Sequence, residues 1–308
     1  MPLKLSMKIF SLSLLLAIVL FTCSSKKSFD HGHFSIGISK GILDNAEIDE
    51  ASGLVASMVN PGMLWTHNDS GDEARLFLID TTGKHRATVH LEGIENRDWE
   101  DIGIGPGPKN GVSYIYIGDI GDNLGIFPYK YIYRIEEPTM TQKGSQAADT
   151  LITQIDSIRF RLADKPRDSE ALFVDPFTKH IYIFSKRESE QVNVYRLANN
   201  GAKADTMATL VTQIPYIQIT AADITGDGTE LLMKNYKNVY YWKRTSDEPI
   251  EKLLKKEPAS LPYAAEPQGE AIAFDRAGRG YYTVSEVANH KRPHLMFYQR
   301  LNRSSKNE

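Results

Sequence analysis

The feature that most limits the possible folds is an internal repeat. Four segments, EASGLV, EDIGIG, EALFVD and EAIAFD, start at Glu50, Glu100, Glu170 and Glu270, and a weaker copy, TAADI, starts at Thr220. The starting positions are 50, 70, 50 and 50 residues apart, and the long interval contains a polar insertion at 139–150. Repeats of this length are typical of propellers and related arrays.

Each leading residue is followed by short runs with the pattern of β-strands. These runs are rich in β-branched and aromatic residues and are separated by Gly, Asn and Asp, which mark turns. No comparably long stretch after the first 22 residues has a helical period. Strands are expected at 63–66, 75–79, 86–90, 114–117, 131–133, 157–160, 180–184, 192–195, 209–212, 230–233, 239–242, 250–254, 280–284 and 294–298.

Four strands per roughly 50 residues is the spacing of a propeller blade. The fifth copy has only three strands, counting its leading segment, before the chain ends. The alternating segment FSIGI at 34–38 can supply the missing strand and so remove an open sheet edge. The sequence therefore predicts an all-β, five-bladed β-propeller over residues 34–302, closed by an N-terminal strand. A six-bladed ring is the alternative if residues 139–150 contain further structure.

The single cysteine, Cys23, follows a segment that looks like a secretion signal. Lys4 and Lys8 precede an apolar run at 9–21, which has the length of a signal core and is short for a membrane span. The segment resembles a bacterial lipoprotein signal. We therefore predict a signal peptide at 1–22, lipidation of Cys23, a tether at 23–33 and a C-terminal tail at 303–308. The predicted location is the cell envelope, with a lipid anchor in a bacterial membrane; a secreted or periplasmic soluble protein is the alternative.

Composition excludes several kinds of partner and cofactor. The chain has 36 basic and 39 acidic residues, a net charge of −3 and no basic stripe, so nucleic acid is not an expected partner. One cysteine rules out an internal disulfide framework and a cysteine-rich zinc or iron–sulfur site.

The predicted propeller would bring the repeated acids to one mouth of its central channel. The connection into each inner strand and the turn after each second strand lie on the same face of a propeller. Carboxylates around a narrow channel repel one another and need a cation, shared protons or basic partners. Ca²⁺ suits such oxygen ligands. The predicted metal ligands are Glu50, Glu100, Glu170, Glu270 and Asp223. Alternatively, these carboxylates only accept backbone N–H groups.

Residues at the ends of second strands are the candidates for catalysis. A site with carboxylates on one side and basic groups on the other would suit a metal-bridged anion such as a phosphate ester. The metal would polarise the phosphoryl group, and lysine or arginine would hold the remaining oxygens. The same residues could instead form turns or pair with the glutamates. The candidates are His67, Asp69 and Asp119 on the acidic side, and Lys186, Arg187 and Lys234 on the basic side.

These repeats, with NDSG at 68–71 and GDIGDN at 118–123, look like a group of mostly uncharacterised secreted bacterial propellers. More distantly, the repeated Glu-Ala-(Leu/Ile) resembles two calcium-dependent groups, the phytase-like or esterase-like propellers and the calcium-activated nucleotidases (apyrases). The latter have five blades and a central calcium ringed by glutamates. The resemblance implies that the four leading glutamates face calcium. Thr220 departs from this pattern, with Asp223 three residues further on.

Two functions of different classes are compatible with these residues. One is a Ca²⁺-dependent phosphoesterase or related hydrolase of the cell envelope that acts on an anionic small molecule. The other is a non-catalytic propeller that binds a protein or glycan partner and holds calcium as a structural plug. A lactonase-like hydrolase is a third option. Because propellers host both enzymes and binding proteins, the fold does not decide whether this chain is an enzyme.

Overall fold

The computed structural model describes residues 33–140, 147–199, 206–245 and 247–301. The predicted signal peptide, the lipidation site Cys23, almost all of the predicted tether, the predicted tail at 303–308 and the middle of the polar insertion lie outside these ranges. Among the described residues, no helix is long and apolar enough to span a bilayer.

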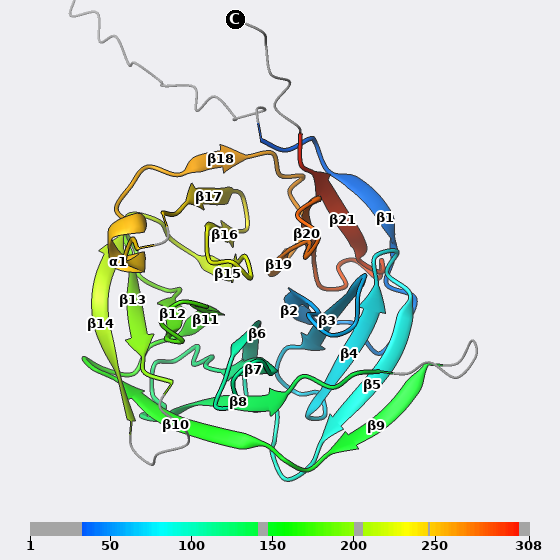
Figure 1. The fold of residues 1–308 in the computed structure, drawn as a ribbon, viewed down its shortest axis with the longest axis horizontal. Helices are drawn as coiled ribbons and strands as arrows, with labels where there is room; N and C mark the ends of the chain where they lie inside the picture. The colour runs from blue at the N-terminus through cyan, green and yellow to red at the C-terminus, as the bar shows by residue number, and fades with distance from the viewer. Residues whose placement is uncertain (1–32, 141–146, 200–205, 246, 302–308) are drawn as a thin grey trace, which may run out of the picture.

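The described strands form five groups around a common axis, as Figure 1 shows. Each group places one strand innermost, and each innermost strand contacts the next around a closed ring. This arrangement confirms the predicted all-β propeller, and we call each group a blade. The innermost strands are β2 (Ala51–Ala56), β6 (Trp99–Pro106), β11 (Ser169–Val174), β15 (Ile219–Ile224) and β19 (Ala271–Phe274).

Within each blade, antiparallel strands follow outward in chain order, much as the sequence pattern predicts. The first blade adds β3 (Met63–Asn68), β4 (Arg75–Asp80) and β5 (His85–Leu91); the second adds β7 (Ser113–Asp119), β8 (Lys130–Glu136) and β10 (Asp156–Leu162); the third adds β12 (Ile181–Ser185), β13 (Val192–Leu197) and β14 (Thr206–Ile214); the fourth adds β16 (Glu230–Asn235), β17 (Val239–Lys243) and β18 (Ala259–Leu261); the fifth adds β20 (Gly280–Val284) and β21 (His294–Gln299).

An N-terminal strand completes the fifth blade, as predicted. β1 (Ile38–Ile42) pairs antiparallel with β21 at the outer edge. The strand begins later than the predicted range of 34–38. Phe34 forms only an isolated bridge with Arg300, and its buried ring packs edge-on against Tyr241 and Tyr281. Phe34, the first residue of the predicted strand, therefore lies before β1, and its buried ring holds the N-terminal segment against the fourth and fifth blades.

The prediction of a strand at 250–254 was wrong. This segment contains a short helix, α1 (Ile250–Leu253), and β18 is the outer strand of the fourth blade instead. Ile250, Leu253 and Leu254 are all buried, and their spacing matches one face of a helix rather than alternate positions of a strand.

The insertion between the third and fourth strands of the second blade, β8 and β10, adds strand pairing at the outer edge of the propeller. β9 (Ala148–Ile152) runs parallel to β5 at the edge of the first blade. β10 and β14 also pair in parallel, which links the second blade to the third. The described part of the insertion therefore extends an existing blade.

The apolar core lies between neighbouring blades. Buried aliphatic and aromatic side chains form clusters that each join two adjacent blades, for example Trp65 of the first blade with Trp99 and Ile117 of the second. Burial of this apolar surface stabilises the ring at about 25 cal/mol per Å². Because each cluster joins two blades, the ends of the inner strands are held in fixed positions around the axis.

Candidate metal centre at one mouth

Acidic side chains from four blades gather at the mouth where the chain enters the inner strands. Three overlapping triads each have ligand atoms within 4.8 Å of one another. We call these seven residues the acidic mouth: Asp69, Asp98, Glu100, Asp168, Glu170, Glu270 and Glu286. All donors are carboxylate oxygens, which suit a hard cation such as Ca²⁺.

β-bulges at the starts of the inner strands set which residues point into this mouth. Trp99 and Asp101 pair with the consecutive residues Asp119 and Gly118, so Glu100 is an extra residue in the ladder. Glu170 is the extra residue at the same place in the third blade. A bulge redirects a side chain and is often found beside functional sites. Here the bulges bring two predicted ligands together.

Glu100 and Glu170 form a buried carboxyl pair. Each residue is 3 % exposed, and their side chains share a hydrogen bond. Burial raises the pKa of both residues; the charge of Glu170 raises the pKa of Glu100 further, whereas Lys186 lowers that of Glu170. A divalent cation bound here would favour the ionised form of both carboxyl groups.

The predicted basic residues are engaged with the acidic mouth. The Lys186 ammonium lies 2.7 Å from a Glu170 oxygen and 3.6 Å from a Glu270 oxygen. Burial alone would lower the pKa of Lys186, but these two carboxylates raise it. Arg187 Nε lies 2.5 Å from an Asp168 oxygen, and its guanidinium also bonds Asn123.

Lys234 lies fully buried beside this group rather than facing solvent. Its ammonium donates to the carbonyl of Gly269 and lies over the ring of Tyr263. Burial lowers the pKa of Lys234 to about 8, although Glu266 and Glu270 favour its charged form. In this conformation Lys234 supports the backbone ahead of Glu270.

The three acidic-side candidates have different environments. Burial raises the pKa of Asp69, which belongs to two of the triads, to about 6. His67 is fully buried, and burial lowers its pKa to about 4, so it is neutral at pH 7. Its Nδ1 lies 2.8 Å from the Asn68 carbonyl oxygen. Asp119 pairs with Arg97 at 2.9 Å. Of these candidates, Asp69 is the one in the acidic mouth.

Two predicted ligands do not join the described triads. The bulge of the first blade places Ser52, rather than Glu50, at the position equivalent to Glu100, and Glu50 is exposed at the rim. Asp223 is buried toward the other end of its inner strand, where it accepts the backbone N–H of Phe274 at 2.7 Å. The sequence repeat matches Glu50 with Glu100, whereas the strand pairing matches Ser52 with Glu100. Glu50 therefore lies two residues before the position that points into the acidic mouth.

Sequence reasoning missed Asp98, Asp168 and Glu286 as site residues. Asp98 and Asp168 follow arginines in the matching segments RDWE and RDSE, two residues before Glu100 and Glu170. That shared lead-in could have identified them. Glu286 follows β20, and its side chain bonds Glu270 and accepts from Gln268 at 2.7 Å.

No protein-family model matches the sequence, and no curated protein matches it. Among solved structures, the fold is similar to the PQQ-bound form of an aldose sugar dehydrogenase from Streptomyces coelicolor, with a TM-score of 0.48 and 10% sequence identity. The match covers 85% of this chain and 98% of that chain. The propeller assignment rests on the strand order described above.

Proposed function

We propose that the acidic mouth binds Ca²⁺ and that the protein is a Ca²⁺-dependent hydrolase of phosphate esters or related anionic esters, held at the cell envelope by a lipid on Cys23. The observation that carries the proposal is the convergence of carboxylates from separate blades within 4.8 Å of one another.

The residues of the acidic mouth suggest a division of roles. Glu100, Asp168 and Glu170 would hold the cation, which supplies polarisation of a phosphoryl oxygen and a lowered pKa of bound water. Asp69, partly exposed and largely ionised at pH 7, is placed to accept a proton from water. Lys186, 2.7 Å from Glu170, is the ammonium group best placed to bind a substrate oxygen.

One observation favours the non-catalytic alternative. All three basic groups proposed to hold an anion are already engaged: Lys186 with Glu170 and Glu270, Arg187 with Asp168, and Lys234 with the Gly269 carbonyl. In this second hypothesis the cation stabilises the mouth, and the surface around it binds a protein or glycan partner.

Both hypotheses predict that Ca²⁺ stabilises the fold. Ca²⁺ at about 100 times its Kd should add about 2.7 kcal/mol to the free energy of unfolding and raise the thermal midpoint. Glu100→Gln should abolish this rise, whereas Asp149→Asn, at an exposed side chain on β9, should retain it. The measurement is thermal unfolding during Ca²⁺ titration, with EDTA as the reversal. An unchanged midpoint in the unsubstituted protein would contradict the cation site.

Hydrolysis separates the two hypotheses. With Ca²⁺ present, we expect turnover of at least one of 4-nitrophenyl phosphate, bis-4-nitrophenyl phosphate and a nucleoside triphosphate. Glu100→Gln should reduce kcat/KM by at least about 100-fold through loss of the metal. Lys186→Met should reduce it by about 100-fold through loss of a charge on the substrate oxygens. A Ca²⁺-dependent thermal shift without turnover of any substrate would support the binding protein.

A further inference from the structure

The opposite mouth of the propeller has a different chemistry. It is formed by the turns that follow the inner strands, and it contains a cavity of about 460 Å³. An adjoining cavity of about 600 Å³ shares Met58, Gly226 and Arg276 with it and includes Phe274. Both volumes are in the range of small-molecule sites. We call this region the apolar mouth.

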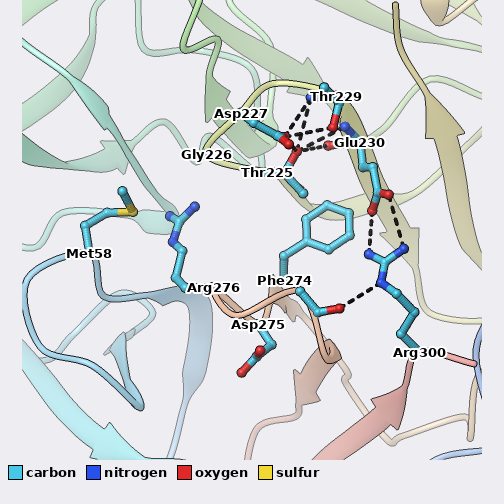
Figure 2. Close-up of a pocket in the computed structure, with 11 residues that line it drawn as sticks. Met58, Thr225, Gly226, Asp227, Thr229, Glu230, Phe274, Asp275, Arg276 and Arg300 are labelled. Atoms are coloured by element: carbon cyan, nitrogen blue, oxygen red, sulfur yellow. Dashed lines mark hydrogen bonds and ion pairs between the residues drawn. The ribbon is translucent and has the colours of Figure 1, made fainter. Parts of the chain in front are cut away.

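Arg276 is the central cationic group of the apolar mouth. It extends from the turn after β19 to the first blade, where its Nε donates to the Ala56 carbonyl at 2.8 Å. Its Nη2 is buried without a hydrogen-bond partner, and no carboxylate among the described residues forms an ion pair with it. Figure 2 shows its guanidinium beside the Met58 sulfur, whereas nearby Arg300 bonds Glu230.

The acids around Arg276 are already bonded to other groups. Asp227 accepts from Thr225 and Thr229 within its own turn. Asp275 pairs with Arg279 at 2.7 Å. Asp223, beneath the mouth, accepts the backbone N–H groups of Phe274 and Ile224 and attracts Arg276 without forming an ion pair with it. The guanidinium therefore retains N–H donors that no described residue uses, and Arg276 lines both cavities.

The walls beside this guanidinium are mainly apolar. Ile104, Val174 and Ile224 come from the ends of three inner strands, and the half-exposed side chain of Met58 lies above them. A Cβ atom added at Gly226 would lie 3.5 Å from Arg276 Nη1 and 3.8 Å from Met58 Cε. A ligand atom at this position would therefore contact both the guanidinium and an apolar side chain.

We propose that the apolar mouth binds a small amphipathic oxyanion, such as a medium-chain carboxylate. Arg276 binds the head group through its unused N–H donors, which match a carboxylate in geometry and charge. The ends of the inner strands and Met58 cover the hydrocarbon body. This site is separate from the acidic mouth and does not depend on the function proposed there.

Calorimetric titration of the protein with hexanoate tests this site, with hexanol and hexylamine as neutral and cationic probes. We expect saturable hexanoate binding, at least about tenfold tighter than that of the other two probes. Arg276→Met should weaken hexanoate binding at least about tenfold, whereas Arg292→Met, an exposed arginine outside both cavities, should leave it unchanged.

A second variant keeps the test decisive if Arg276→Met fails to fold. Met58→Glu places a carboxylate beside the guanidinium at a side chain that is 50% exposed, so the fold should survive. It should also abolish hexanoate binding by occupying Arg276. Equal binding of hexanoate and hexanol, no saturable hexanoate binding, or full affinity in either folded variant would overturn the proposal.

Discussion

Asp101→Ala is expected to lower the free energy of unfolding by about 3–5 kcal/mol. The Asp101 side chain is fully buried and accepts backbone N–H groups from three blades: Ile102 at 2.9 Å, Leu172 at 2.9 Å and Ala222 at 3.3 Å. Burial raises the pKa of Asp101, and these three donors oppose that shift. Alanine would leave all three N–H groups buried without an acceptor.

Equilibrium urea unfolding, followed by tryptophan fluorescence, measures this effect. Asp101→Asn keeps one oxygen acceptor and should fall between alanine and the unsubstituted protein. Asp149→Ala, at a side chain that is 77% exposed on β9, should change stability by less than about 0.5 kcal/mol. A loss below about 1 kcal/mol for Asp101→Ala would show that water replaces the carboxylate.

Arg244→Met is expected to destabilise the propeller by a similar amount, about 3–5 kcal/mol. Arg244 forms a buried ion pair with Asp175 at 2.7 Å, and the two side chains are 3% and 0% exposed. The pair joins the end of the third blade's inner strand to the fourth blade. Methionine would retain most of the volume but leave the Asp175 carboxylate buried without its main partner.

The double variant Arg244→Met with Asp175→Asn isolates the effect of the unpaired charge. Because asparagine removes that charge, the double variant should be more stable than Arg244→Met alone. Urea unfolding of the two single variants and the double variant gives the coupling energy. Additive losses would show that the single substitution acts through packing or the other contacts of Arg244, which include the Glu248 carbonyl at 2.6 Å.

Most of the architecture could be predicted from the sequence because a propeller repeats both its strand pattern and its polar positions. The strand at 63–66, for example, lies within β3, and the one at 239–242 within β17. The prediction failed at 250–254, where the apolar spacing fits a helix better than a strand. The sequence pattern did not predict β9, which pairs with β5 at the outer edge of the first blade. The formation of such an edge strand depends more on its partner strand than on its own residues.

The acidic mouth could be predicted only in part. Glu100 and Glu170 lie in one acidic triad and Glu270 in another, because each residue stands directly before the regular part of an inner strand. The prediction for the first blade chose Glu50 because this residue, like Glu170 and Glu270, is followed by alanine. The strand pairing shows that Ser52 occupies the position equivalent to Glu100. Bulges depend on strand pairing, so a short repeat could not reveal the shift.

The pairing of β1 with β21 has a consequence for how the molecule is made. The first and last described strands pair with each other, so the fifth blade stays incomplete until the residues of β21 have left the ribosome. Until then β20 exposes an unpaired edge that can recruit other chains. A chain truncated before β21 would therefore be prone to aggregate even though the first four blades could be complete.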